Sequence, residues 1–322
     1  MLLPVYNGAK YLSLAIESVL HQSYSNLELI IVDDASTDES WNIICGFSDS
    51  KLLTTRNHQN VGLSRTLNIA ANMASGKYLA RHDQDDISHR HRIRHQVQFL
   101  DTNPNVVAVG TWVQLRRYFD STFQDHIPRR QHPTTDPNIR LLLTWNSPFV
   151  HGSTMMRRVA FEKCGGYSQN NDITPPEDYE LWTRMSALGD LANISTPLLT
   201  YQVNPNGMSQ TQSEEIFAKL TTISQGFINQ ILGTQLKTSV ATSLTILNGR
   251  PRSDLCFRDF FKADQLVLVL AKVITEQRSR VPLRQLIRAL RTIHFVQLSH
   301  AIQKYPRLNR IAHFLLGAAR RS

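Results

Sequence analysis

Residues 77–86 read Lys-Tyr-Leu-Ala-Arg-His-Asp-Gln-Asp-Asp, a short apolar strand that runs out into three carboxylates within four positions. Carboxylates grouped this closely repel one another unless a positive charge lies among them. Oxygen ligands of this kind suit hard divalent cations, especially beside a phosphate-bearing substrate. The same pattern is also common in solvated acidic loops, so the stretch by itself leaves both interpretations open.

Apolar strands and helical patterns alternate along the first half of the chain. Continuous apolar strands in such an alternation are typical of an α/β fold whose mostly parallel sheet is covered by helices on both faces. Ligands of these sheets bind at the carboxyl ends of the strands. Because Asp33-Asp34 and Asp83–Asp86 both follow strands, we expect them to share one rim of the sheet. The strands are predicted at 2–6, 27–32, 52–56, 78–80 and 106–109, and the helices at 12–20, 62–73 and 93–100.

The pattern changes after Tyr201. Residues 202–210 read as a linker, and the apolar spacing from Glu214 onward is helical. We therefore predict a first domain over 1–205 and a helical, basic extension over 206–322. Within the first domain, a helix near 139–145, a strand over 151–156 and a helix over 178–188 are predicted.

The net charge of +9 belongs mostly to the end of the chain, since residues 281–322 hold eight Lys or Arg and no Asp or Glu. Arg284, Arg288 and Arg291 fall on one stripe of a predicted helix, opposite Leu and Ile residues. Such a helix can lie on an anionic membrane surface, or it can pack as an accessory helix with its arginines in water. Nucleic-acid binding is not expected, because the segment lacks interleaved aromatic residues and a recognised module.

Cysteine content and hydropathy place the chain in the cytoplasm. The three cysteines are scattered, which suits a reducing compartment and argues against a disulfide framework or a Cys-based zinc site. No signal peptide is visible, and the longest apolar run, 266–271, is far too short to cross a bilayer. We expect a cytoplasmic protein, peripheral at most at the inner face of the cell membrane.

Four motifs occur in order at the predicted strand and helix ends. The motifs are Pro4-Val5-Tyr6-Asn7, Val32-Asp33-Asp34, Asp83-Gln84-Asp85-Asp86 and Pro176-Glu177-Asp178-Tyr179-Glu180-Leu181-Trp182. This ordered set resembles the family-2 glycosyltransferases of the GT-A fold, and the resemblance covers roughly residues 1–205. It implies a Rossmann-like GT-A domain of the bacterial surface-polysaccharide type.

The resemblance implies a nucleotide-sugar site at the ends of the first strands. Pro4 and Tyr6 would line it, with Tyr6 packing against the base; alternatively, Tyr6 only closes the first helix. Asp34 would accept a hydrogen bond from the base ring N–H, which uracil, thymine and guanine each offer. Arg65 either reaches the diphosphate or is a plain surface arginine.

The acidic stretch would be the D-x-D motif of the family. Asp83 would hold ribose or sugar hydroxyls and contribute to the metal site. Asp85 would coordinate Mn²⁺ or Mg²⁺, and Asp86 is a second candidate because the motif is extended by one residue. The metal would neutralise charge on the departing nucleoside diphosphate as a Lewis acid.

The motif at residues 176–182 would supply the catalytic general base. Asp178 would deprotonate the acceptor hydroxyl, Glu177 would assist or only position it, and Trp182 is a further candidate in the same motif. Alternatively, these acidic residues simply favour a helix N-terminus. His151 either lines the acceptor or phosphate pocket or is a core histidine.

The His89, His91 and His95 cluster is interpreted as a solvated helix face. His91 and His95 stand one helical turn apart, as metal ligands can. Arginines at 90, 92 and 94 interleave the cluster, and their charges disfavour a bound cation.

Two departures from the family pattern stand out. Only three residues precede Pro4, so either the first strand is short or the chain starts upstream. Tyr201-Gln202-Val203-Asn204 stands where relatives often have Tyr-Arg-x-His, which removes a phosphate contact and a candidate metal ligand. The Gln-x-x-Arg-Trp of processive synthases is absent.

We therefore predict an inverting, metal-dependent, non-processive glycosyltransferase. It would move a sugar from a nucleoside-diphosphate sugar, with UDP-sugars favoured, onto a glycan or lipid-linked glycan acceptor. Two alternatives stay open. One is a nucleotidyltransferase, whose Gly-rich triphosphate loop is absent here; the other is a degenerate relative that binds glycan or membrane without turnover.

Overall fold

A computed structural model describes most of the first two thirds of the chain and short pieces beyond. The chain divides into two compact units. The first holds Met1–Ile139 and Ser147–Lys219, and the second holds Arg140–Asn146 and the described residues from Leu220 onward. The predicted boundary at 205 lies outside the described residues. These are 1–117, 129–203, 214–233, 235, 266–267, 269–270, 272–274 and 276.

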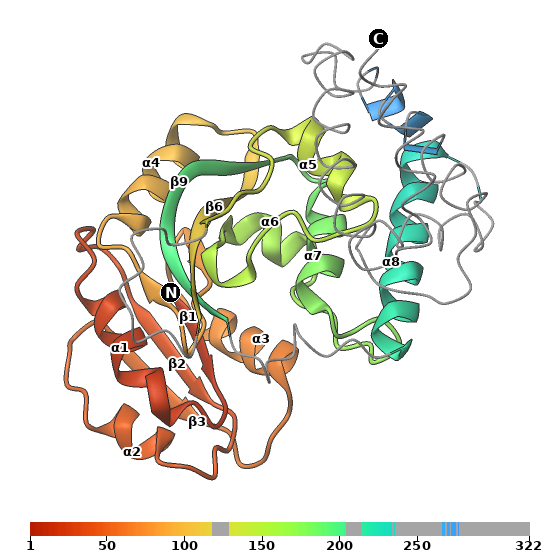
Figure 1. Ribbon diagram of the computed structural model, residues 1–322. Coiled ribbons are helices and arrows are strands. Elements are labelled where there is room, and N and C mark those ends of the chain that lie inside the picture. The colour runs from red at the N-terminus through yellow and green to blue at the C-terminus, as the bar shows by residue number, and fades with distance from the viewer. Residues whose placement is uncertain are drawn as a thin grey trace. The chain divides into compact units, whose positions relative to one another are not determined.

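The first sheet is parallel and has the order β1-β2-β3. Its two faces are covered by different helices (Figure 1). Leu3 and Val5 of β1 face α1 and α2, whereas α3 contacts β1 and β2 from the opposite face. The elements are β1 (Leu2–Val5), α1 (Ala9–Leu20), β2 (Leu29–Asp33), α2 (Ser40–Cys45), β3 (Leu52–Arg56) and α3 (Leu63–Met73).

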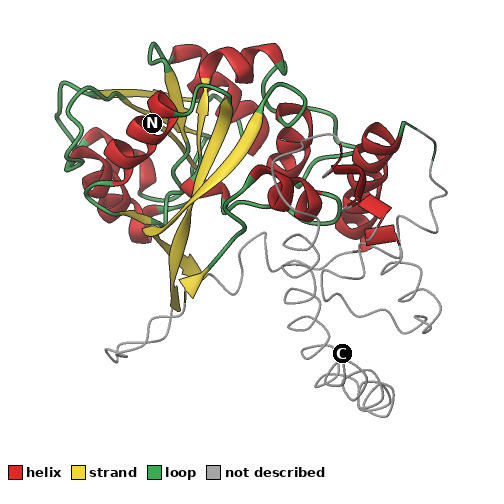
Figure 2. Ribbon diagram, turned by 90° about the horizontal axis from the view of Figure 1, so that it is seen from above, coloured by secondary structure: helices red, strands yellow, loops and turns green. Residues whose placement is uncertain are grey.

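The second sheet is mixed, with the order β4-β8-β6-β9-β5 and β7 paired to β6. The long strands β6 and β9 pair in parallel, and the other pairs are antiparallel (Figure 2). The parallel arrangement predicted from strand–helix alternation therefore holds for the first sheet and for the β6–β9 pair. The strands are β4 (Tyr78–Ala80), β5 (Ile87–Ser88), β6 (Val106–Arg117), β7 (Arg129–Arg130), β8 (Met155–Arg157) and β9 (Asp190–Val203).

The prediction of a strand over 151–156 was wrong in its first half. His151–Ser153 form a short 3-10 helix, η1, and only Met155–Arg157 are extended. The Ser153 hydroxyl donates to the Val150 carbonyl and the Thr154 hydroxyl to the His151 carbonyl, and such local bonds favour a turn. The remaining helices are α4 (Arg92–Thr102), α5 (Asp136–Leu143), α6 (Arg158–Lys163), α7 (Glu177–Met185) and α8 (Glu214–Leu232).

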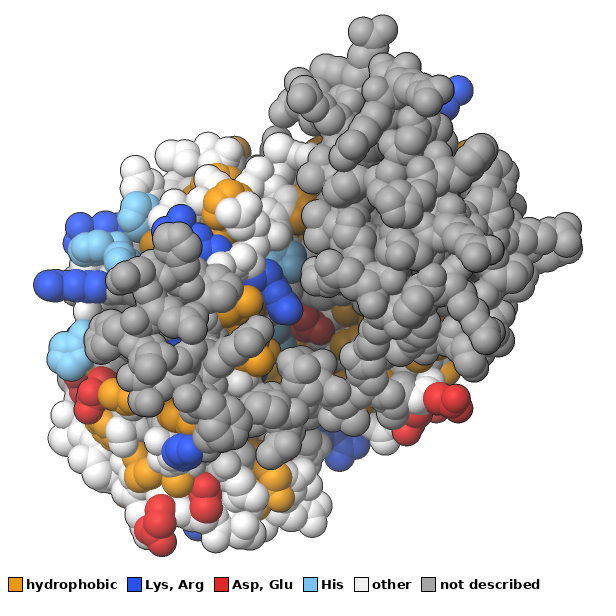
Figure 3. Space-filling view, viewed as in Figure 1, with side chains coloured by type: hydrophobic (Ala, Val, Ile, Leu, Met, Phe, Trp, Pro, Cys, Tyr) orange, Lys and Arg blue, Asp and Glu red, His pale blue; other side chains and the backbone are white. Residues whose placement is uncertain are grey.

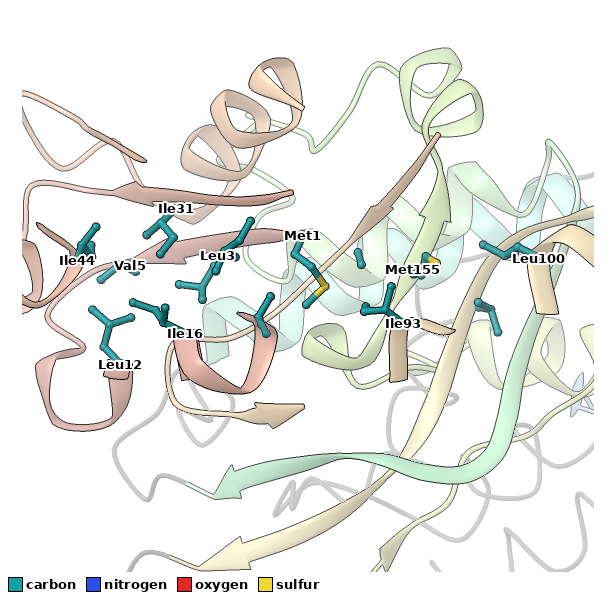
Figure 4. Close-up of a cluster of buried hydrophobic side chains, with 14 of the residues drawn as sticks. Met1, Leu3, Val5, Leu12, Ile16, Ile31, Ile44, Ile93, Leu100 and Met155 are labelled. Atoms are coloured by element: carbon teal, nitrogen blue, oxygen red, sulfur yellow. The ribbon is translucent and has the colours of Figure 1, made fainter. Parts of the chain in front are cut away.

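The main core lies between the first sheet and α1. Leu3 and Val5 alternate along β1 toward Leu12 and Ile16 of α1, and all four side chains are buried (Figure 4). The cluster continues through Ile93 and Met155 into the second sheet. The two sheets therefore share one core, which fixes the loops at the strand ends on a rigid base.

The described helices include none that is long and apolar enough to cross a membrane. The basic helix predicted near 283–293 lies outside the described residues.

Candidate active site

The acidic stretch runs beside β1. Arg81 forms an isolated parallel bridge with Leu2, and the His82 N–H donates to the Leu2 carbonyl over 3.0 Å. Residues 82–86 then follow the direction of β1 toward Tyr6. The loops that follow β1, β2 and β4 therefore meet at one rim, where the sequence predicted the two acidic clusters.

The loop after β1 is held by side chains that follow β2. Pro4 lies within β1 opposite Val32, and the residue Tyr6 beyond it is 47% exposed. The Asn7 N–H donates to the Ser36 hydroxyl over 3.0 Å, and Asn7 itself has a positive φ of 49°. Asparagine tolerates this left-handed conformation better than most residues. Tyr6 is thereby presented to solvent on a fixed loop, as a residue that stacks on a base would be.

Asp34 is buried and uses its carboxylate within the protein. One oxygen accepts hydrogen bonds from the Asn57 amide and the Val61 N–H, and the other accepts from the Gly62 N–H over 2.9 Å. Asp34 therefore holds the turn before α3. A carboxylate oxygen has two lone pairs, so the Gly62-bonded oxygen keeps room for one further donor, such as a base N–H.

Asp33 has a different role from its neighbour. Its carboxylate is fully buried and forms an ion pair with Arg56 Nε over 3.0 Å. The same carboxylate accepts a hydrogen bond from the Ser36 N–H. Asp33 therefore ties the end of β3 to the loop after β2.

Arg81 is the buried cation of the acidic stretch. Only 1% of the residue is exposed, and Nη2 lies 2.6 Å from Asp83 Oδ1. Its Nη1 donates to the His82 carbonyl. The guanidinium therefore compensates part of the charge that the three aspartates bring together.

The other two aspartates are held in a poorly solvated place. Burial, followed by the charge of Asp83, raises the pKa of Asp85 to about 6. Burial also raises the pKa of Asp86 well above its ordinary range, with the charges of Asp83 and Asp85 adding to it. The site therefore favours a proton or another cation at these carboxylates.

Asp86 is also linked to the last strand. Its Oδ1 accepts a hydrogen bond from the Gln202 N–H of β9 over 3.0 Å, while Oδ2 is buried without a donor among the described residues. An unpaired buried carboxylate oxygen is costly, and a cation would compensate it.

Gly152 brings η1 close to the same carboxylates. A Cβ atom on Gly152 would lie 2.5 Å from Asp83 Oδ2 and 2.6 Å from Asp86 Oδ2. Two carboxylate oxygens thus flank one small backbone position, and one of them lacks a partner. This donor chemistry fits a hard divalent cation, although the described residues hold no preformed group of three His, Cys, Asp or Glu around a metal position.

The predicted base lies at the start of α7. Two cis peptide bonds, Thr174–Pro175 and Pro175–Pro176, precede the helix. Asp178 Oδ2 accepts a hydrogen bond from the Ser147 hydroxyl over 3.1 Å. Burial raises the pKa of Asp178, with a smaller contribution from Asp83.

Glu177 contacts a histidine and tyrosine pair. Its carboxylate lies 3.6 Å from His151 Nδ1, and His151 Nε2 shares a hydrogen bond of 2.8 Å with the Tyr167 hydroxyl. Burial lowers the pKa of His151 well below its ordinary value, which favours the neutral ring. Burial, followed by the charge of Asp178, raises the pKa of Glu177 to about 7.

Trp182 packs behind this group. Its ring meets Phe149 edge-on at 5.0 Å and His151 at 6.2 Å between centroids. The indole N–H is buried without an acceptor among the described residues. In Figure 3, acidic, basic and histidine side chains come together in a recessed part near the centre of the face shown.

Two other predicted features stay away from these contacts. Arg65 is exposed on the first turn of α3, and its diphosphate role stays a prediction. The His89 and His91 rings stack edge-on at 5.6 Å, and His91 Nδ1 bonds to the Ser23 hydroxyl. Arg94 and His95 are exposed on α4, as predicted, but His89 and His91 precede the helix. The prediction was wrong for Arg92, which is fully buried and donates hydrogen bonds to the Arg81 and Thr154 carbonyls.

Sequence reasoning assigned no role to several side chains that organise the site. Arg81 and Gln84 lie within the acidic stretch but carry no separate signal. Ser147 and Tyr167 lie far along the chain, and only their contacts reveal them. An Arg next to a D-x-D motif is a usable signal, because a buried acidic cluster needs a compensating charge.

Comparison with known proteins agrees with this geometry. The model of the family described as "Glycosyl transferase family 2" matches residues 1–165. Escherichia coli "UDP-Glc:alpha-D-GlcNAc-diphosphoundecaprenol beta-1,3-glucosyltransferase WfaP" is 35% identical over 217 residues, which are 67% of this chain and 81% of that protein.

Other relatives are matched over less of their length. An uncharacterized glycosyltransferase of Haemophilus influenzae is 29% identical over 65% of this chain and 67% of its own. Bacillus subtilis "Putative glycosyltransferase EpsE" is 33% identical over 57% of this chain and 65% of its own. The chain thus spans about two thirds of the length of these two relatives.

Solved structures share the fold. Staphylococcus aureus TarS 1–349 in complex with UDP-GlcNAc has a TM-score of 0.58 at 15% identity, covering 96% of this chain and 90% of that one. The mannosyltransferase PcManGT of Pyrobaculum calidifontis, in complex with GDP-Man and Mn²⁺, has a TM-score of 0.54 at 16% identity, covering 94% and 85%. The fold is therefore GT-A.

Proposed function

Because the chain belongs to glycosyl transferase family 2, we propose that it is an inverting, metal-dependent glycosyltransferase acting on a nucleoside-diphosphate sugar. One observation carries the proposal. The acidic stretch after β4 and the carboxylates that begin α7 lie about ninety residues apart in sequence, yet η1 contacts both: a Cβ on Gly152 would lie 2.5 Å from Asp83 Oδ2, and the adjacent His151 Nδ1 lies 3.6 Å from the Glu177 carboxylate. This proximity supports a donor-binding cluster and a base that act in one site.

The donor would bind along the rim. Pro4 and Tyr6 would line the base, Asp34 would accept from the base N–H through its less occupied oxygen, and Asp83 would bind ribose or sugar hydroxyls. Arg65 would approach the diphosphate. UDP-sugars are the favoured class; the likeness to TarS bound to UDP-GlcNAc supports the choice through the fold alone.

A divalent cation, Mn²⁺ or Mg²⁺, would be held by Asp85 with Asp83, and Asp86 offers a further oxygen. The unpaired Asp86 oxygen and its approach to Asp83 at Gly152 support this donor set. When bound, such a cation supplies Lewis-acid stabilisation of charge on the diphosphate.

Asp178 would act as the general base. Its carboxylate takes the proton of the acceptor hydroxyl as that oxygen attacks the anomeric carbon and the bond to the diphosphate breaks. A single displacement of this kind inverts the anomeric configuration. Ser147 orients the carboxylate, and burial raises the pKa of Asp178, which makes it a stronger base.

The acceptor is proposed as a glycan or lipid-linked glycan in surface-polysaccharide synthesis, with one sugar added per encounter. The name of the E. coli relative, which acts on a diphosphoundecaprenol-linked sugar, supports this class. A cytoplasmic location with peripheral contact at the membrane is part of the same proposal.

Calorimetric titration tests the donor site. UDP, GDP and dTDP are each titrated with Mn²⁺ and with EDTA, and we expect one nucleotide to bind only with Mn²⁺. Absence of binding to all three would favour the degenerate, non-catalytic relative.

The base assignment has its own test. Asp178→Asn keeps the shape and the Ser147 contact but removes the proton acceptor, so transfer should fall by about 10²–10⁴-fold while nucleotide affinity changes little. Full activity in Asp178→Asn would show that Asp178 is not the base. The matched control is Asp172→Asn, which makes the same replacement at an exposed position on the loop before α7.

A further inference from the structure

Gln84, the middle residue of the acidic motif, uses its side chain on another loop. Its Oε1 accepts a hydrogen bond from the Tyr6 N–H over 2.9 Å, and its Nε2 donates to the Tyr6 carbonyl over 3.1 Å. Both backbone polar groups of Tyr6 are therefore bonded to one amide, 78 residues away in sequence. The Gln84 amide therefore makes the two hydrogen bonds with the Tyr6 backbone that a neighbouring β-strand would otherwise make.

Gly8 makes room for this contact. The three heavy atoms nearest to a Cβ on Gly8 would all belong to the Gln84 side chain, with Cδ at 2.5 Å and Cγ at 3.0 Å. A residue larger than glycine at position 8 would therefore push the Gln84 amide away from Tyr6.

The opposite side of the same loop is held independently. The Asn7 side-chain carbonyl accepts from the Thr37 N–H over 2.8 Å, and the Ala9 N–H donates to Asp38 Oδ2 over 3.0 Å. The segment 6–9 is thus tied to the loop after β2 on one flank and to the acidic loop on the other. Within the part of the chain that the structure describes, Gln84 alone hydrogen-bonds Tyr6 to the acidic loop that would bind the cation.

We propose that Gln84 is a positioning residue that couples the acidic loop to recognition of the nucleotide base. By fixing the Tyr6 backbone it sets the plane on which the base stacks, relative to Asp83 and Asp85 on either side of it. The inference rests on the proposed function, because it assumes that Tyr6 packs against the base of a nucleoside diphosphate.

Comparing a ligand that has a base with one that lacks it distinguishes a positioning role of Gln84 from a general structural role. Gln84→Ala removes both bonds and introduces no charge among the aspartates. The affinity for the nucleoside diphosphate that the unaltered chain binds best, with Mn²⁺, should fall about 5- to 30-fold, as expected for two neutral hydrogen bonds. The affinity for Mn²⁺-pyrophosphate, which has no base, should stay within about twofold.

A matched control and two outcomes bound this test. Gln98→Ala makes the same replacement at an exposed position on α4 and should change neither affinity. Equal loss of nucleotide and pyrophosphate binding would mean that Gln84 only maintains the structure of the loop. Unchanged nucleotide binding would mean that the contact with Tyr6 does not contribute to nucleotide recognition. Either result overturns the inference and leaves the proposed function standing.

Gly8→Ala approaches the contact from the other side. In the unaltered background its Cβ displaces the Gln84 amide, so nucleotide binding should weaken as in Gln84→Ala. In the Gln84→Ala background the obstructing atoms are gone, so the second substitution should add little, which is a coupling that a double-mutant cycle measures. Additive losses would refute the inference. If the unaltered chain binds no nucleotide with Mn²⁺, the inference and the proposed function fail together.

Discussion

At the scale of single residues, Arg81 carries the electrostatic balance of the site. It is nearly fully buried and pairs with Asp83, whereas Asp85 and Asp86 have no ion-pair partner among the described residues. Removing one partner of a buried ion pair leaves an uncompensated charge and typically costs about 3–5 kcal/mol.

We predict that Arg81→Met lowers the free energy of unfolding by about 3–5 kcal/mol in EDTA. Mn²⁺ should recover more stability in this variant than in the unaltered chain, because the cation replaces part of the missing charge. Thermal unfolding with and without Mn²⁺ measures both effects. Arg184→Met breaks the Arg184–Glu180 pair within α7 and should show no such recovery; an equal response in both variants would contradict the prediction.

Glu177 governs how the site responds to pH. Its folded-state pKa of about 7 lies above the ordinary value of 4.5, so folding favours the protonated form. This group's contribution to stability is therefore fully present below pH 4.5 and is lost as the pH rises toward 7.

Catalysis should have the opposite dependence, because the base must be ionised. We predict that the transfer rate falls on the acid side with apparent values that belong to the Glu177–Asp178 pair and lie above the ordinary carboxyl range, because burial raises the pKa of both groups. Glu177→Gln removes a neighbouring negative charge and should move this acid limb to lower pH. A pH–rate profile that is unchanged by the substitution would show that Glu177 does not influence the base.

At the scale of elements, η1 matters because Gly152, which has no side chain, lies directly against the carboxylates of Asp83 and Asp86. Gly152→Ala would place a methyl group where Asp83 Oδ2 and Asp86 Oδ2 approach. We predict a loss of Mn²⁺ affinity of at least tenfold, measured by calorimetry without nucleotide, because both oxygens must move. Gly226→Ala on α8, where a Cβ would meet nothing within 4 Å, is the control. Unchanged Mn²⁺ binding in Gly152→Ala would separate η1 from the cation site.

Some of these elements could be predicted from the sequence and others could not. The strands before Tyr6 and Asp33 are short apolar runs, so their ends and the common rim followed from pattern alone. β6 extends to Arg117, well past the predicted 106–109. The prediction followed a continuous apolar run, whereas Gln114 and Arg116 alternate with apolar residues in the second half of the strand. The Gln84 contact could not be predicted, since the middle position of a D-x-D motif accepts many residues and the partner is a backbone.

At the scale of the whole molecule, the basic segment 281–322 is a sequence feature that lies outside the described residues. If it is the membrane-binding alternative, binding should depend on its charge. We predict that the full chain co-sediments with vesicles containing anionic lipid. Replacing Arg284, Arg288 and Arg291 with Gln should weaken the free energy of vesicle binding by about 1 kcal/mol for each charge removed.

Vesicles of neutral lipid serve as the control for that measurement, and 0.5 M salt should release the protein because the attraction is screened. No binding to anionic vesicles, or binding that survives all three substitutions, would favour the packed accessory helix. Nucleotide binding with Mn²⁺ should be the same in the substituted chain, because none of the three arginines belongs to the proposed donor site.

The bond between the Gln202 N–H and Asp86 Oδ1 gives the molecule a spectroscopic reporter. An amide proton bonded to a carboxylate oxygen resonates at a frequency that depends on the charge of that carboxylate. Protonation of Asp86, or a cation arriving at its other oxygen, would therefore shift the Gln202 amide signal in a nuclear magnetic resonance spectrum. The site can be observed from the end of β9, without a dye, a substrate or a reaction.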